Sequence, residues 1–64
     1  MELTRWVPDQ RGEGRGVRTT AHVEAGYLVL STWRAAQCVA TVRLEPSEAA
    51  QLISRLAEGL AELS

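Results

Sequence analysis

The sequence predicts an α+β domain, a three-stranded antiparallel β-meander followed by one long C-terminal amphipathic helix packed on one sheet face. Apolar residues alternate with a period of two over residues 17–44 and recur every three or four residues over 46–63. The chain of 64 residues is the size of one small domain, and such a domain buries only about 60% of its unfolded surface. We therefore expect a marginal core.

Residues 1–16 are expected to form an N-terminal arm or a fourth, edge strand (residues 2–7) followed by a glycine-rich loop. The segment 8–16 holds glycines at positions 12, 14 and 16 and lacks side chains that pack, which predicts a mobile loop. Residues 17–64 are expected to be the single folded domain.

Within the meander, Glu24-Ala25-Gly26 is typical of a three-residue hairpin loop with Gly26 in the left-handed conformation. This loop would pair Val23 with Tyr27. A second turn around Ala35-Ala36 would pair Trp33 with Cys38. In this register the helix receives one face, composed of Val17, Ala21, Val23, Tyr27, Val29, Trp33, Cys38, Ala40, Val42 and Leu44.

The helix is predicted from Pro46, which suits the first helical position, and from Glu48, which suits the positive end of the helix dipole. Its apolar stripe consists of Ala49, Leu52, Ile53, Leu56, Leu60 and Leu63.

The central strand carries large apolar side chains on both sides, which a sheet covered on one face only does not need. Leu28, Leu30 and Val39 are expected on the face away from the helix, as an interface. Their cover would come from the N-terminal segment, a second copy of the chain or another protein. The predicted function is a self-associating, non-enzymatic protein–protein interaction module, with an accessory or regulatory role, most simply as a homodimer.

Several chemistries find no support in the sequence. With one cysteine, Cys38, and one histidine, His22, the chain offers neither an intrachain disulfide nor a four-ligand zinc site without carboxylates. In the expected register Cys38 and His22 point to opposite faces, so no thiol–imidazole pair is expected. No catalytic residue and no cofactor is predicted, and the short apolar runs predict no membrane span. A reducing, cytoplasmic location is the expectation.

All seven basic residues are arginine, and Lys, Asn and Phe are absent, a composition typical of GC-rich bacterial genomes. Residues 1–44 hold six arginines and four acids (+2), whereas residues 45–64 hold one arginine and four glutamates (−3), which together give the net charge of −1. The alternative function is therefore binding of single-stranded nucleic acid through cations and stacking side chains of the sheet face and N-terminal arm. The candidate contacts are Arg11, Arg15, Arg18, Arg34 and Arg43.

The order of strands and helix over residues 17–63, with Val-Arg-Leu-Glu-Pro-Ser-Glu-Ala-Ala-Gln-Leu at the junction, is similar in outline to the transcriptional positive-cofactor family. That resemblance implies a curved sheet that binds single-stranded DNA and a helix that supports dimerisation. The basic run that the family carries along its sheet is absent from this sequence.

Overall fold

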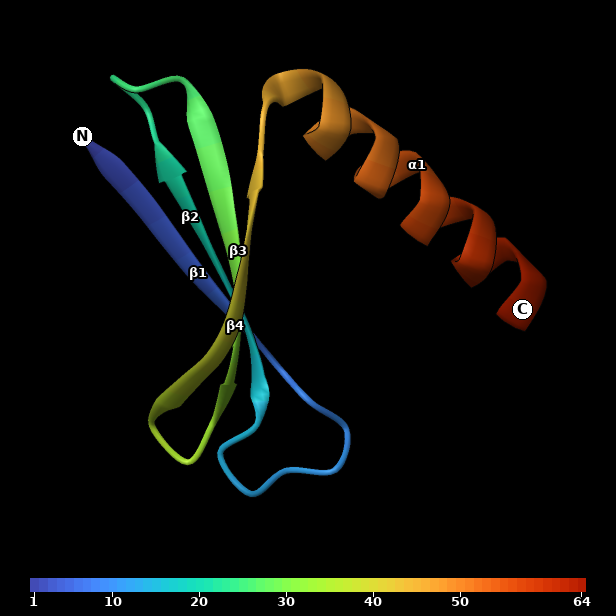
Figure 1. Cartoon of the computed structure of the whole chain (residues 1–64). Helices are drawn as coiled ribbons and strands as arrows, with labels where there is room; N and C mark the ends of the chain where they lie inside the picture. The colour runs from blue at the N-terminus through green and yellow to red at the C-terminus, as the bar shows by residue number, and fades with distance from the viewer.

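The computed structural model describes residues 1–64 and contains one sheet and one helix (Figure 1). The elements are β1 (Glu2–Pro8), β2 (Gly16–His22), β3 (Tyr27–Arg34), β4 (Gln37–Leu44) and α1 (Pro46–Leu63). The four strands lie in the order β1-β2-β3-β4, and every neighbouring pair is antiparallel. The predicted α+β class is confirmed, and residues 2–8 form the fourth strand of the sheet rather than an arm.

The glycine-rich loop between β1 and β2 is closed by its own hydrogen bonds. The Asp9 amide donates to the Arg15 carbonyl at 2.9 Å, and the Gly12 amide donates to the Asp9 carbonyl at 3.1 Å. Gly12 and Gly14 both have positive φ, at 74° and 70°, which glycine adopts without a steric penalty. The loop predicted to be mobile thus has a hydrogen-bonded structure over residues 9–15.

The predicted register between β2 and β3 is wrong by one residue. Tyr27 pairs with His22 and not with Val23, so the hairpin loop has four residues, 23–26. The Gly26 amide donates to the His22 carbonyl at 2.9 Å, and the Val23 amide donates to the Met1 carbonyl at 3.2 Å. Val23 is drawn toward the start of β1 by that bond, and Gly26 has the expected positive φ of 82°.

Between β3 and β4 the predicted pairing of Trp33 with Cys38 is confirmed. The turn lies at Ala35-Ala36, where both alanines have positive φ, 49° and 66°. A bulge between Thr32 and Trp33 then places Val39 as an extra residue on β4, and Thr32 pairs with Ala40. The remaining pairs therefore differ by one residue from the expected ones.

These shifts exchange side chains between the two sheet faces, because a one-residue slip reverses the face. Leu28 and Leu30 lie on the side that meets α1, whereas Tyr27, Val29, Trp33 and Cys38 lie on the opposite side. We call the first side the helix-side face; the register assigns to it Leu3, Arg5, Val7, Val17, Thr19, Ala21, Leu28, Leu30, Thr32, Ala40, Val42 and Leu44. The second, the outer face, carries Glu2, Thr4, Trp6, Arg18, Thr20, His22, Tyr27, Val29, Ser31, Trp33, Cys38, Thr41 and Arg43.

The helix begins where the sequence predicts. Pro46 occupies its first turn, the Glu45 side chain accepts from the backbone of Glu48, and the Glu45 amide donates to the Glu48 carboxylate at 2.9 Å. These reciprocal bonds form a capping box, which satisfies amides that the first helical turn leaves free.

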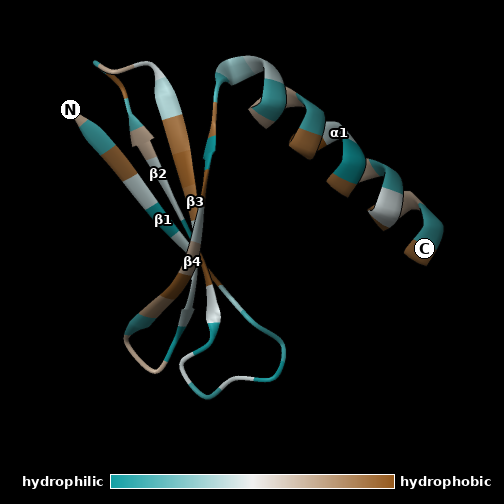
Figure 2. Cartoon of the chain, in the orientation of Figure 1, coloured by the Kyte–Doolittle hydropathy of each residue, from teal (hydrophilic) through white to brown (hydrophobic).

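The sequence predicted that the helix packs on one face of the sheet, and this prediction is wrong. The helix leaves the end of β4 and diverges from the strands, so the two elements form a V (Figure 1). Its hydrophobic positions lie on the side turned toward the sheet (Figure 2). No helix residue is buried, and Ile53, Leu56 and Leu60 are 69%, 61% and 67% exposed.

No apolar side chain of the chain is buried. The two buried residues are Gly16 and Ser31. The radius of gyration is 12.9 Å, although the chain has only 64 residues. A compact domain reaches about 13 Å only at 100 residues. The single chain is therefore extended and lacks a core.

Candidate functional site

An open groove between α1 and the helix-side face is the main concave surface with an apolar lining. Its volume is about 440 Å³, and ten of its eleven lining residues are hydrophobic. The sheet contributes Val7, Val17, Thr19, Leu28, Leu30 and Leu44, together with Val29, which belongs by register to the outer face and borders depressions on both sides. The helix contributes Ala49, Leu52, Ile53 and Leu56. We refer to this surface as the groove.

The groove forms where the strand that ends at Leu44 and the helix that begins at Pro46 are joined through Glu45. Strand alternation brings Leu28 and Leu30 to the same side as Leu44, and the helical stripe turns Leu52 and Leu56 toward them. Of the twelve residues on the helix-side face, Arg5 alone is charged. The groove can therefore exclude water only if another apolar surface enters it.

The predicted interface residues lie in different places. Leu28 and Leu30 are half-buried and line the groove, on the face that α1 approaches rather than the face away from it. The one-residue register shift accounts for this correction. Val39 lies in the β4 bulge and is 65% exposed, away from the two leucines.

β1 extends the sheet sideways and does not cover it. Leu3 and Val7 pair with Ala21 and Val17, so they enlarge the helix-side face instead of shielding it. They remain 50% and 58% exposed. The N-terminal segment is thus excluded as the cover for Leu28 and Leu30.

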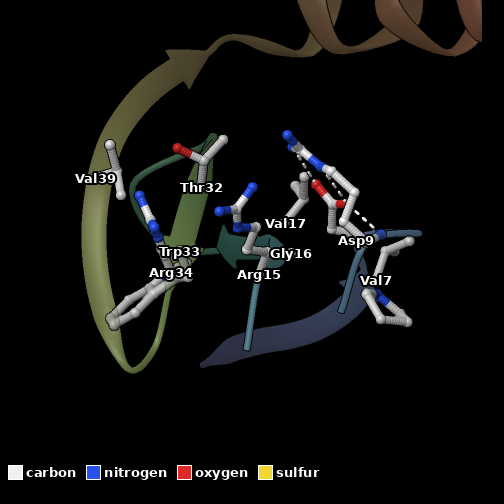
Figure 3. A pocket seen from close by; sticks show the side chains of 11 residues that line it. Val7, Asp9, Arg15, Gly16, Val17, Thr32, Trp33, Arg34 and Val39 are labelled. Carbon is white, nitrogen blue, oxygen red and sulfur yellow. Dashed lines mark hydrogen bonds and ion pairs between the residues drawn. The ribbon is translucent and has the colours of Figure 1, made fainter. Parts of the chain in front are cut away.

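One end of the groove adjoins a basic depression of about 290 Å³ between the 9–15 loop and the β3–β4 turn (Figure 3). Arg11, Arg15 and Arg34 line it, and Val7 and Val17 belong to both surfaces. Arg11 is bound to Asp9 through two side-chain hydrogen bonds of 3.0 and 2.8 Å. Arg15 lies 3.6 Å from Glu13, its Nε is buried without a hydrogen-bond partner, and Arg34 has no carboxylate partner.

The Asp9 carboxylate is the most perturbed titrating group of the chain. Hydrogen bonds from the Arg11 side chain and backbone amide, the latter at 2.7 Å, hold the pKa of Asp9 far below its ordinary value of 3.8. The same pairing raises the pKa of Arg11. This pair fastens the start of the loop, because both groups lie within residues 9–11.

The outer face combines arginines with aromatic rings. The Arg18 guanidinium lies 4.1 Å from the centre of the Trp33 ring, and that of Arg43 lies 4.4 Å from the Tyr27 ring. The Trp33 indole N–H donates to the Ser31 hydroxyl at 2.9 Å. Neither Arg18 nor Arg43 is ion-paired, so their charges are available to an anion.

The five arginines proposed for nucleic acid are divided between two surfaces. Arg18 and Arg43 lie on the outer face with Tyr27 and Trp33. Arg11, Arg15 and Arg34 line the basic depression between the 9–15 loop and the β3–β4 turn. The sequence assigned the aromatic rings to the helix-covered face; the observed register brings them to the arginines.

Cys38 and His22 share the outer face, contrary to the expectation that they point apart, since both line one shallow depression there. Their partners on β3, Trp33 and Tyr27, are six positions apart, or about 20 Å along the strand. No thiol–imidazole pair forms. Cys38 is exposed on an edge strand rather than buried among apolar residues, and the His22 imidazole lies 2.8 Å from the Glu2 carboxylate.

No group of three or more His, Cys, Asp or Glu side chains comes together that could hold a metal ion. The one helix is not long and apolar enough to cross a membrane. No protein family model, curated protein or solved structure matches this chain.

Proposed function

We propose that this chain is a self-associating protein–protein interaction module without catalytic activity, and that a second copy of the chain closes its groove. The observation that carries the proposal is the coexistence of an apolar groove with the absence of any buried apolar side chain. Burial of one leucine contributes about 1.5–3 kcal/mol. A single chain without such burial has little to offset its conformational entropy.

A second copy is favoured as the occupant because the chain itself carries the complementary surface. The exposed helix stripe of Ile53, Leu56 and Leu60 and the sheet leucines are both incompletely covered. In a two-fold symmetric dimer, the helix stripe of each chain can contact the sheet leucines of the other, so the same contact forms twice. The lone unpaired thiol, Cys38, fits a reducing compartment such as the cytoplasm.

The test compares two double variants with the same change in net charge. Leu56→Glu with Leu60→Glu places carboxylates on the apolar stripe of the helix. Gln51→Glu with Arg55→Gln alters the opposite side of the helix, its polar face. In a lone chain both stripe leucines are already exposed, so their replacement would have little effect. We expect the stripe variant to lose the dimer, or to unfold at a concentration where the polar-face variant remains a folded dimer. A stripe variant that keeps the wild-type mass and stability would contradict the proposal.

The outer face favours a second candidate function, binding of single-stranded nucleic acid. The observation in its favour is the stacking of Arg18 on Trp33 and of Arg43 on Tyr27 on one sheet face. Bases stack on aromatic rings and on guanidinium planes, and arginines contact phosphates. A protein–protein role for the groove leaves this face free.

Fluorescence anisotropy with a labelled single-stranded oligonucleotide tests the second function. Wild-type protein is expected to bind at low salt and to lose affinity steeply as salt rises, because phosphate contacts release counterions. Arg18→Gln with Arg43→Gln should weaken binding at least tenfold, whereas Arg55→Gln on the helix should not. Equal affinity of the two variants, or no binding at low salt, would argue against this function.

A further inference from the structure

We infer that the element of the second copy that fills the groove is its α1, so that two chains exchange their helices across each other's sheets. This inference rests on the proposed self-association. In such a dimer, the apolar stripe of each α1 meets the helix-side face of the other copy.

The chain's own helix forms one wall of the groove and is held away from the sheet by the junction between β4 and α1. One residue, Glu45, separates Leu44 at the end of β4 from Pro46 at the start of α1. Glu45 is extended, with φ −75° and ψ 165°, and its carbonyl accepts from the Ala49 amide at 2.9 Å. Together with the capping box to Glu48, this bond fixes the direction in which the helix leaves. Ile53 and Leu56 line the groove, yet their side chains stay exposed because the sheet is too far away to cover them.

The dimensions of the two elements match. An α-helix of 18 residues is about 27 Å long, and the eight residues of β3 span about 27 Å. A helix with side chains is about 10 Å wide and adds a single layer over the sheet. A helix from another chain can therefore cover Leu28 and Leu30 over the full length of the strand.

The charges of the two halves favour helix on sheet over the like-with-like arrangements. The sheet half, residues 1–44, has six arginines against four acids, or +2, and residues 45–64 have one arginine against four glutamates, or −3. Sheet-on-sheet or helix-on-helix contact alone would bring together halves of like charge. Exchange of helices brings together halves of opposite charge at both contacts.

Disulfide trapping between two singly substituted chains tests the exchange. Both chains carry Cys38→Ser, which removes the native thiol. One carries Thr19→Cys, which is on the groove side, or its neighbour Thr20→Cys, which is on the outer face. The other carries a cysteine on the helix stripe (Leu56→Cys, Leu60→Cys or Leu63→Cys) or, as a control, on the polar face (Gln51→Cys). Because each chain has one thiol, a mixed disulfide forms only between chains.

After mixing, brief unfolding and refolding together, and mild oxidation, we expect a mixed covalent dimer from Thr19→Cys with at least one stripe cysteine. We expect at least tenfold less from Thr20→Cys or from Gln51→Cys. Light scattering of the Cys38→Ser parent is measured alongside. A dimeric parent without selective cross-linking of Thr19→Cys to the stripe overturns the exchange but leaves self-association standing. A monomeric parent overturns both.

Discussion

The Trp6 indole lies directly over Gly16 on the outer face of the sheet. A methyl group at Gly16 would come within 2.6 Å of the indole Cη2 and of the Val7 carbonyl oxygen. Gly16 is one of the two buried residues of the chain, although it stands at the start of β2 next to an exposed loop. The ring thus takes the space that a side chain at residue 16 would occupy and joins β1 to β2.

Gly16→Ala is expected to lower the free energy of unfolding by about 1–3 kcal/mol, because both the ring and the backbone of β1 must move. Urea unfolding followed by circular dichroism measures the effect. Gly59→Ala is the matched control: it lies in the helix with no atom near the added methyl group, and it should gain about 1 kcal/mol. Equal stability of Gly16→Ala and wild type would mean that Trp6 does not pack on Gly16.

The β3–β4 turn offers a stabilising change. Ala35 and Ala36 both have positive φ, which costs a residue with a side chain about 1–2 kcal/mol. Two-residue hairpin turns in which both residues have positive φ favour the sequence Asn-Gly. Ala35→Asn with Ala36→Gly should therefore raise the unfolding free energy by about 1–2 kcal/mol. The helix change Ala57→Gly should lower it by about 1 kcal/mol. A loss of stability in the turn variant would contradict the observed backbone conformation.

The Asp9–Arg11 pair predicts a pH dependence. The pKa of Asp9 is lower in the folded chain than its ordinary value of 3.8, so its ionised form stabilises the fold above that pH. This contribution is lost as the pH falls below 3.8 toward the folded pKa. Asp9→Asn should therefore be less stable than wild type near neutral pH, and the difference should shrink in acid. Urea midpoints measured at several pH values check this, and a difference that grows in acid would contradict it.

The sequence predicts the elements better than their register. The helix from Pro46, the two hairpins and the edge strand follow from local signals: a proline at the first helical turn, the positive φ of Gly26 and strand alternation. The register depends on the bond from the Val23 amide to the Met1 carbonyl and on the bulge at Val39. These are contacts between segments, and a local pattern does not encode them. A slip of one residue then moved Leu28 and Leu30 to the other face.

The open groove could not be predicted from the periodicity of the sequence either. An amphipathic helix next to an apolar sheet predicts that the two pack together, as we expected. Whether α1 lies on its own sheet depends on the angle at Glu45, which the capping box sets. The unpaired stripe of Leu56 and Leu60 is consequently a tertiary feature, although each residue on it was predicted.

The mass of the folded chain in solution tests the central claim most directly. Sedimentation equilibrium over a dilution series should give twice the chain mass of 7.0 kDa at high concentration. Loss of the dimer on dilution should coincide with loss of helical circular dichroism, because the groove supplies the missing core. A folded particle with the mass of one chain at every concentration would contradict the account.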